Sequence, residues 1–417
     1  MKFPDPPLLL QLVIILVTAR LCSFVLRRLG QPAVVGEMIA GLLLGPLVFG
    51  ALSPEFHAAV FARPTLGALD SLGEVGLVLF MFVVGCELRV TEGSRARLRA
   101  AGYVGSLSVA LPAMLALGIA PLLHTQLAPA GVRFWPFALF LALSVSVTAF
   151  PVLARILKDQ RRTQSPLGQL SLSSAALVDV FAWIMLALIV VLIKSGEIWS
   201  RFYAMTGALA CFVAVVFWVL RPFYARLLRR HALTDTSGAM LLASLLIGVF
   251  ACAAATEWLG LHAVFGAFLF GACLPGGLRV LDSLAERVQH VAVVVLMPIF
   301  FATTGLVTDP SAFCAAGGLT LALILVIAVV GKILGAAAGA RIAGHGWRDS
   351  LAVGSLMNTR GLMELIVLNI GFDLGFIPQN VFTMLVIMSV VTTVMTGPLL
   401  RKLLPSAGYV IPVGVEA

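Results

Sequence analysis

The chain has few charged residues. Only 11% of its 417 residues are Asp, Glu, Lys or Arg, whereas a soluble globular protein carries about 25%. Hydrophobic residues make up 60%, and the mean hydropathy is +1.07. This composition excludes an ordinary soluble domain and predicts an all-α polytopic membrane protein embedded in the lipid bilayer.

Acidic residues are especially scarce, with 19 Asp and Glu against 28 Lys and Arg, which gives a net charge of +9. A basic balance can indicate nucleic-acid binding. Here the basic residues fall mainly in short segments between apolar runs, where the positive-inside rule explains them without a nucleic acid. We therefore expect no nucleic-acid partner.

The sequence also lacks the motifs of several other classes. Its six cysteines contain no CxxC pair and lie in or beside apolar segments, so they are typical of small core residues. It has no HExxH motif, no GxSxG motif and no second well-placed Asp for an aspartyl dyad. These absences argue against an intramembrane enzyme, and we expect the chain to be no enzyme and to need no cofactor.

Hydropathy and breaks at charges, Pro and Gly predict thirteen membrane spans, the first retained and not cleaved as a signal peptide. We expect one transmembrane domain over 1–405 and a short cytoplasmic tail over 406–417. The predicted spans are 7–27, 33–50, 68–88, 100–124, 134–157, 168–193, 202–221, 237–256, 258–276, 284–307, 313–342, 348–371 and 378–400.

The distribution of basic residues orients these spans. With the N-terminus outside, the inner loops and the tail hold 20 Lys and Arg and the outer loops hold 5. Because positive loops stay in the cytoplasm, this predicts a cell-membrane protein with its N-terminus outside and its C-terminus cytoplasmic.

Two predicted spans carry a helix breaker flanked by polar residues. Span 134–157 has Ser144, Ser146 and Thr148 before Pro151, and span 348–371 has the run Asn358–Thr359–Arg360–Gly361. Either break alone is commonly an ordinary kink. They are the fifth and the twelfth predicted spans, and because they are an odd number of spans apart they cross the membrane in opposite directions. This pattern predicts inverted repeats, 7–193 and 237–400, joined by a linker helix over 202–221, with two crossed broken helices at a midplane site.

Asp179 is a single ionisable residue inside an apolar run, SLSSAALVDVFAWIMLAL (171–188). An acid at mid-span costs about 2.5–3.5 kcal/mol on insertion scales and indicates function. Lys332 lies on a helix face with Gly331, Gly335 and Gly339, a small-residue pattern that allows close helix packing. We expect Lys332 to pair with Asp179, and the Thr148 hydroxyl to share the ion site.

Other charges lie inside predicted spans. Arg360 and Glu364 are four residues apart, so on a helix they can pair, and a structural clamp is as good an interpretation as ion binding. Glu37 and Glu74 are lone acids on glycine-rich spans, for which a satisfied carboxyl is favoured over a transport role.

Six stretches resemble the cation/proton antiporter superfamily, in the branch of Kef-type potassium efflux proteins and plant CHX-type exchangers. They are GEMIAGLLLGP (36–46), FMFVVGCELR (80–89), LSVSVTAFPVLARIL (143–157), SSAALVDVFAWIMLAL (173–188), MPIFFATTGL (297–306) and MNTRGLMELIVLNIG (357–371). The resemblance implies the Na⁺/H⁺ antiporter fold, a homodimer and elevator-like alternating access. It maps the ion-binding carboxylate to Asp179, the breaks to Thr148 and Asn358–Gly361, and the basic residue to Lys332.

The chain departs from that family pattern in two places. Val178 stands where the family usually has Asp, Asn or Gln before the ion-binding acid, which favours an Asp179–Lys332 pair and an electroneutral cycle. A C-terminal nucleotide-binding domain is absent, so we expect no NAD or glutathione control.

The leading hypothesis is therefore exchange of K⁺ or Na⁺ for H⁺, K⁺ slightly favoured, 1:1 at Asp179, with a role in pH homeostasis. Two alternatives stay open. An organic-solute carrier on the same fold is disfavoured by the buried acid, and a non-transporting sensor or channel is kept open by Val178.

Overall fold

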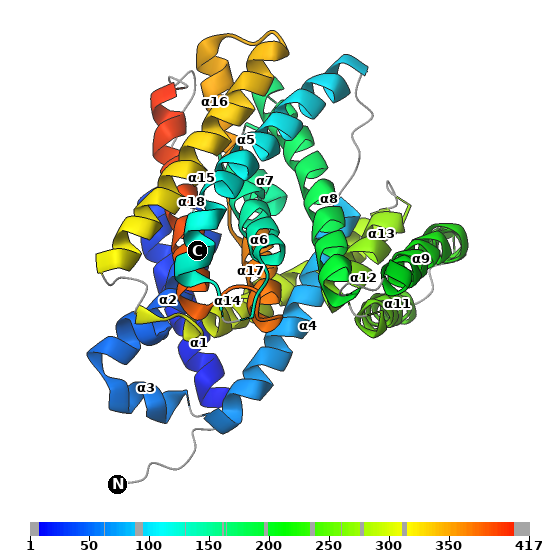
Figure 1. Cartoon of the computed structure of the whole chain (residues 1–417). Helices are drawn as coiled ribbons and strands as arrows, with labels where there is room; N and C mark the ends of the chain where they lie inside the picture. The colour runs from blue at the N-terminus through cyan, green and yellow to red at the C-terminus, as the bar shows by residue number, and fades with distance from the viewer. Residues whose placement is uncertain are drawn as a thin grey trace.

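The computed structural model describes residues 8–61, 63–87, 95–129, 131–160, 162–163, 165–195, 199–233, 238–259, 261–275, 279–310 and 315–403, so the predicted tail 406–417 lies outside it. Within these ranges every regular element is helical (Figure 1). The prediction of an all-α membrane fold is confirmed.

The helices follow one another with short connections. They are α1 (Leu8–Arg28), α2 (Ala33–Leu44), η1 (Pro46–Gly50), α3 (Pro54–Val60), α4 (Arg63–Glu87), α5 (Arg95–Leu127), α6 (Phe134–Ser146), α7 (Phe150–Asp159), α8 (Pro166–Ser195), α9 (Trp199–Val215), η2 (Val216–Leu220), α10 (Arg221–Leu233), α11 (Gly238–Trp258), α12 (Ala263–Cys273), α13 (Arg279–Val291), η3 (Ala292–Leu296), α14 (Met297–Leu306), α15 (Ala315–Ile342), α16 (Trp347–Met357), α17 (Leu362–Asp373) and α18 (Gln379–Leu403). The η elements are single π-helical turns; η2 and η3 continue the helices on either side of them, whereas η1 follows Gly45, which is extended.

Each predicted span lies on one helix or on consecutive helices. In the part of the chain that the structure describes, ten helices are long and apolar enough to cross a membrane. The other three ranges hold the short α12 and the two broken pairs, α6 with α7 and α16 with α17. The count of thirteen crossings stays a prediction.

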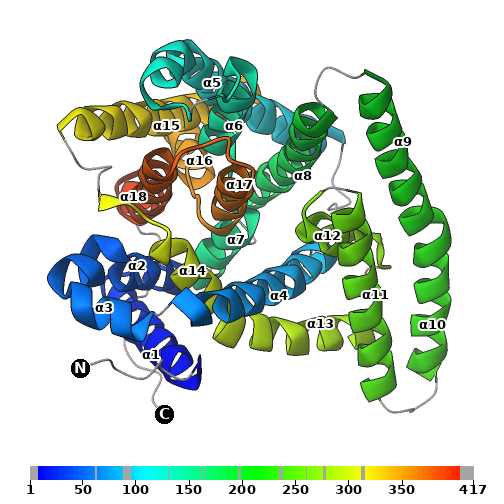
Figure 2. The same ribbon diagram turned by 60° about the horizontal axis from the view of Figure 1, so that its bottom comes forward.

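Eight helices, α5–α8 and α15–α18, pack closely on one another and are called the core group here. Figure 2 shows them together on one side of the molecule, with α5 and α15 side by side. The α15 face with Gly331, Gly335 and Gly339 lies directly on the α5 backbone, where a Cβ at Gly331 would come within 2.8 Å of Pro112 Cα. The predicted small-residue face therefore joins these two long helices.

The scaffold group consists of α1, α2, α4 and α11–α14, which pack mainly among themselves. Two backbone contacts between glycines hold it together. Gly41 of α2 meets Gly305 of α14, and Gly85 of α4 meets Gly271 of α12, so a Cβ at any of the four would collide with the facing backbone. Close approach without side chains is a common way to join membrane helices.

The helices of each group contact one another more extensively than they contact the helices of the other group. The continuous helix α9–η2–α10 runs beside α11 at the edge of the molecule and connects the halves of the chain (Figure 2). Between the groups, α2 contacts α18, Asn369 Nδ2 donates to Thr304 Oγ1 at 3.2 Å, and the Asp309 amide donates to Thr383 Oγ1 at 2.8 Å. These polar contacts, together with Trp183 of α8 against Phe265 and Phe268 of α12, hold the groups in this relative position.

Candidate functional site

The first break lies between α6 and α7. Helix α6 ends at Ser146, and Val147, in extended conformation, begins a three-residue gap before α7 starts at Phe150. Pro151, the second residue of α7, has no amide to continue the hydrogen bonding of α6, which explains why the helix stops here. The polar sequence of this span therefore coincides with non-helical backbone in the molecule's interior.

The second break lies between α16 and α17. Helix α16 ends at Met357 and α17 begins at Leu362. Gly361 has φ of 140°, a conformation that other residues adopt only with strain, so glycine is required at this point. The four residues of the break, Asn358 to Gly361, are all buried.

The two breaks lie against each other. The Thr148 hydroxyl donates to the Met357 carbonyl oxygen at 3.1 Å, and the Ala149 amide donates to the Thr359 carbonyl oxygen at 3.0 Å. Thr148 and Thr359 are fully buried. Because backbone groups inside a membrane protein must be satisfied by protein or by a polar cavity, these bonds make the crossing stable.

Asp179 of α8 lies beside the first break and is fully buried. The Phe150 amide, the first of α7, and the charge of Lys332 both act on its carboxylate. Neither contact has hydrogen-bond geometry, so both carboxylate oxygens lack a partner. A buried charge without partners is costly, which indicates that an ion, a proton or water completes this site.

Two cations satisfy the free end of α6. Arg360 Nη1 donates to the Ser144 carbonyl oxygen at 3.0 Å and Nη2 donates to the Val145 carbonyl oxygen, while Lys332 Nζ donates to the Ser146 carbonyl oxygen. Cations at a helix C-terminus are favoured by the partial negative charge of its carbonyls. Both side chains are fully buried.

This arrangement differs from the expected direct ion pair. Among the described residues, no contact within 4.0 Å joins Lys332 to Asp179, because the ammonium group is bound to the end of α6 instead. The direct pair is therefore absent from the structure, and the influence of Lys332 on Asp179 is electrostatic.

Arg360 also has the partner that its spacing indicated. Its Nη1 lies 3.5 Å from Glu364 Oε1, and both side chains are fully buried. Thr393 of α18 fixes the backbone of the same break, since it accepts from the Arg360 amide at 3.0 Å and donates to the Arg360 carbonyl oxygen at 2.8 Å. The second break is thus held by side chains on α17 and α18.

Several oxygen atoms around the breaks have coordination capacity left. The Thr359 hydroxyl and the Asn358 Oδ1 atom are buried without hydrogen-bond partners, as are both oxygens of Asp179. Thr148 uses its proton on Met357 and keeps lone pairs. Hard oxygen donors of this kind suit an alkali cation.

Val178 contributes no polar atom to this site. Its side chain is buried and lines an apolar cavity of about 570 Å³ between α5, α6 and α8, which Ser146 also lines. Asp179 is therefore preceded by an apolar side chain and not by a second polar residue.

The remaining acids predicted in spans lie elsewhere. Glu37 of α2 lies 3.8 Å from Arg20 of α1, whose Nη2 also donates to the Val294 carbonyl oxygen at 2.8 Å. Glu74 of α4 is exposed. The structure does not bring either residue to the crossing.

Sequence reasoning missed the residues that hold the breaks together. Sequence patterns do not single out Thr393, because α18 is rich in Ser and Thr, and hydroxyls in membrane helices usually bond to their own helix. The sequence did indicate that the end of α6 needs capping, because a helix that ends inside a membrane leaves carbonyl oxygens that require donors. Arg360 and Lys332 were the available buried donors.

Two broken helices that cross inside a membrane protein beside a buried carboxylate define a secondary transporter. The chain belongs to the sodium/hydrogen exchanger family, whose transmembrane model matches residues 13–404. The superfamily indicated by its motifs is thereby confirmed.

Relatives in three organisms are similar over most of the chain. The Na(+)/H(+) antiporter NhaS4 of Synechocystis sp. is 37% identical, and the match covers 96% of this chain and 98% of that protein. The cation/H(+) antiporter 17 of Arabidopsis thaliana is 37% identical, and the K(+)/H(+) antiporter 1 of Saccharomyces cerevisiae is 32% identical. The matches cover 94% and 96% of this chain, but only 48% and 46% of those two longer proteins.

The fold is that of a solved antiporter. The sodium proton antiporter MjNhaP1 from Methanocaldococcus jannaschii superimposes with a TM-score of 0.69, covering 96% of this chain and 99% of that one at 15% identity. The prediction of a Na⁺/H⁺ antiporter-like fold is confirmed by this likeness.

Proposed function

We propose that the protein exchanges a monovalent cation, K⁺ or Na⁺, for H⁺, and that the two compete for Asp179. The observation that carries this proposal is a fully buried carboxylate with both oxygens unpartnered, beside two crossed helix breaks. The relatives named as Na(+)/H(+) and K(+)/H(+) antiporters support the same reaction.

The cycle follows from the cost of the bare charge. When Asp179 is ionised, its oxygens with those of Thr148, Thr359 and Asn358 coordinate a dehydrated cation, and protonation expels it. The site is neutral both when Asp179 is protonated and when it holds the cation, whereas the bare carboxylate is too costly to move through the protein. One carboxylate then exchanges one cation for one proton, so the cycle is electroneutral.

Movement of the core group against the scaffold group supplies alternating access. The breaks and Asp179 all belong to the core group, whose helices contact one another more extensively than they contact the scaffold group. This division supports an elevator-like displacement of the core group that carries the site from one side to the other.

The inverted repeats 7–193 and 237–400 are supported by paired contacts. The contact of α2 with α14 joins the second span to the tenth, and that of α4 with α12 joins the third to the ninth. In the proposed repeats, the second and third spans correspond to the ninth and tenth, so each of these two contacts is the counterpart of the other. Each contact contains a glycine pair. The linker 202–221 falls on α9, η2 and α10.

The remaining features complete the proposal. We place the protein in the cell membrane as a homodimer with thirteen crossings, the N-terminus outside and the C-terminus cytoplasmic. Its partners are the bilayer, monovalent cations and protons, and it works without a resident cofactor or metal.

Reconstituted protein tests this function. Liposomes with an acidic interior receive K⁺, Na⁺, Li⁺ or Rb⁺ outside, and a pH dye follows loss of the gradient. We expect exchange with at least one cation, no dependence on an imposed voltage, and loss of exchange in Asp179→Asn. Asp373→Asn, an acid at the end of α17 away from the breaks, is the matched control. Exchange that persists in Asp179→Asn would contradict the site.

A further inference from the structure

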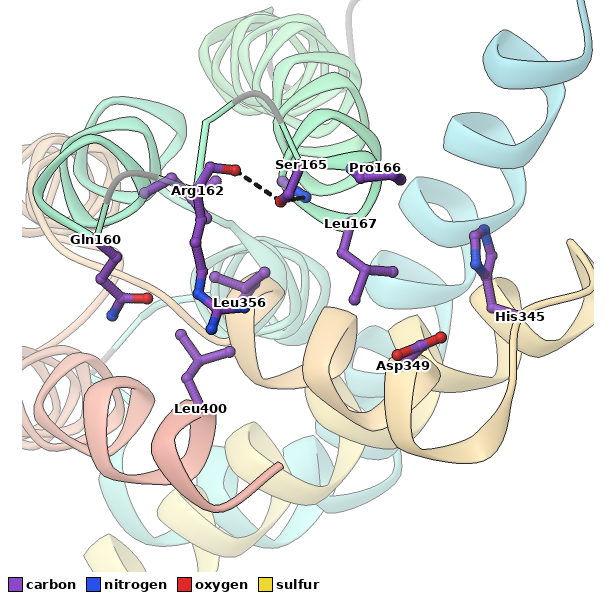
Figure 3. A pocket seen from close by; sticks show the side chains of 11 residues that line it. Gln160, Arg162, Ser165, Pro166, Leu167, His345, Asp349, Leu356 and Leu400 are labelled. Atoms are coloured by element: carbon purple, nitrogen blue, oxygen red, sulfur yellow. Dashed lines mark hydrogen bonds between the residues drawn. The ribbon is translucent and has the colours of Figure 1, made fainter. Parts of the chain in front are cut away.

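Two cavities of different character lie in the core group. The smaller, of about 260 Å³, is formed where α7 ends and α8 and α16 begin. Figure 3 shows Arg162, His345 and Asp349 around it, so its lining includes charged groups, and by the predicted topology it marks the cytoplasmic end. The larger is the apolar cavity of about 570 Å³ between α5, α6 and α8. Because the two linings differ in polarity, the two cavities suit different occupants.

The larger cavity is a groove that faces the bilayer. All of its lining residues belong to α5, α6 and α8, and all are apolar except Ser106 and Ser146. Leu177 and Phe181 of α8 are 38% and 44% exposed, and Ala110 of α5 is exposed as well. Both helices are long and apolar enough to cross a membrane, so these exposed side chains meet lipid and not water.

Hydrocarbon suits this groove better than water does. The Ser146 hydroxyl already donates to the Ala142 carbonyl oxygen at 2.6 Å, and a water in a protein cavity needs two to four polar partners. An unfilled groove would also forfeit the dispersion contacts of its lining. The apolar lining therefore favours a flexible hydrocarbon chain from the surrounding bilayer.

The dimensions of the groove fit such a chain. On α5 it runs from Gly102 to Leu117, about 22 Å along the axis at 1.5 Å per residue. One leaflet contributes about half of a hydrocarbon core of about 30 Å, so an extended acyl chain fits along the groove. Small residues on α5 leave this space, since a Cβ at Gly105 would already lie 3.5 Å from Val178 Cγ2. The volume falls in the range of about 300–1,000 Å³ that is typical of ligand sites.

Two arginines lie at the cytoplasmic end of the groove. Arg97 and Arg99, near the start of α5, are both exposed. Arg97 Nη1 donates to Gln169 Oε1 at 3.4 Å, which places this end of α5 beside the start of α8. Arg99 is three residues before Gly102, so it lies on the face of α5 that lines the groove, one turn beyond it. Arginine binds phosphate through paired N–H donors, and basic residues beside a membrane span attract anionic lipids.

We propose that the groove binds one acyl chain of an anionic phospholipid from the cytoplasmic leaflet, with the lipid phosphate held by Arg99. The chain lies against Val178 and Ser146 and completes, on the bilayer side, the apolar wall next to Asp179 and the end of α6. Since α5, α6 and α8 pack on one another within the core group, the lipid stays with that group. Its binding does not depend on which ion the protein exchanges.

Photolabelling tests where the chain lies. The protein is reconstituted in phosphatidylcholine vesicles with a small share of phosphatidylglycerol that carries a diazirine in one acyl chain, and labelled peptides are identified by mass spectrometry. We expect residues 102–117 and 177–189 to be labelled severalfold more than 326–334, a segment of α15 with exposed apolar side chains. Ala110→Phe, which fills the groove, should remove this excess. The matched control Ala338→Phe, at an exposed alanine of α15, should keep it.

Two results of the labelling would overturn the lipid site. Equal labelling of the groove and of 326–334, with no response to Ala110→Phe, would mean ordinary bilayer contact only. An excess that disappears as the ratio of protein to lipid rises would assign the groove to a second copy of the chain.

Arg99→Gln tests the position of the phosphate. It should reduce labelling of the groove by phosphatidylglycerol severalfold, whereas Arg348→Gln, at another exposed arginine of the core group, should not. In detergent, added phosphatidylglycerol should raise the Tm of the wild type and of Arg348→Gln, because a ligand of the folded state stabilises it, and should raise that of Arg99→Gln less. Equal responses of the two variants in both measurements would overturn the proposal. Neither measurement requires exchange, so failure of the lipid site and failure of the proposed function are distinguishable.

Discussion

The two helix breaks meet at one crossing but differ in their chemistry. Both end a helix inside the core group, and they are bonded to each other through Thr148 with Met357 and Ala149 with Thr359. The first break faces an acid, Asp179, whose oxygens are unpartnered. The second carries a cation, Arg360, whose guanidinium group is bound to α6 and to Glu364.

This difference shows how a repeated fold acquires one binding site. On α18, Thr393 bonds to the second break through both the amide and the carbonyl of Arg360, so the charged residue of that break is held by structural contacts, while the Thr359 hydroxyl and Asn358 Oδ1 stay unbonded. The first break keeps an open carboxylate. A single titrating group follows, and with it a one-for-one exchange.

The largest effect is expected at Arg360 of the second break. Arg360→Gln leaves carbonyl oxygens of α6 and the Glu364 carboxylate without their cation, and breaking a buried ion pair from one side costs about 3–5 kcal/mol. We expect a large fall in thermal stability in detergent together with loss of exchange. Arg341→Gln, a change of the same kind at an exposed arginine, should alter stability by less than about 0.5 kcal/mol. Equal stability of the two variants would contradict the structural role.

Lys332→Gln should preserve folding and change exchange. The amide can still donate to the Ser146 carbonyl oxygen, but the positive charge that acts on Asp179 is gone. Without that charge the protonated carboxyl is favoured, so the pH of half-maximal exchange should move upward. The measurement is the rate against pH in liposomes. An unchanged profile would show that Lys332 serves only to cap α6.

The two threonines of the breaks should separate stability from ion binding. Thr148→Val removes the hydroxyl bonded to Met357, so we expect a loss of about 0.5–1.5 kcal/mol in stability. Thr359→Val removes a hydroxyl without a partner, so stability should hold while the KM for the cation rises. Unfolding curves measure the stability of the two variants, and cation titrations of their transport rate measure the KM. If the KM rises only in Thr148→Val, the cation lies nearer to the first break than to the second.

Val178→Thr should give the smallest effect. It adds a hydroxyl beside Asp179 with little change of shape, on the wall of the apolar cavity. We expect the relative rates of K⁺ and Na⁺ to change by less than about tenfold, which corresponds to 1.4 kcal/mol. Rates with both cations in the same liposomes measure this. A larger change would mean that Val178 sets the ion preference.

Composition and residue spacing predicted much of the fold. Apolar runs located the helices, and the proline and glycine interruptions located both breaks, because these residues act on the backbone within one turn. Asp179 was found because an isolated acid in an apolar run is costly wherever the chain folds.

The contacts around the site could not be read in the same way. Whether Lys332 reaches Asp179 or the end of α6 depends on how α15 crosses α6, a tertiary distance of a few Å between residues 186 positions apart. The bonds of Thr393 to Arg360 and the unpartnered hydroxyl of Thr359 likewise depend on packing. Sequence patterns indicate which face a residue lies on, but not its partner across helices.

Competition at Asp179 is tested most directly by the apparent KM for the cation, measured in liposomes at a series of pH values on the side of cation entry. If proton and cation share one carboxylate, the KM should rise about tenfold for each pH unit of acidification below the group's titration, with an unchanged maximal rate. A KM that stays constant while the maximal rate falls would contradict competition at a single site.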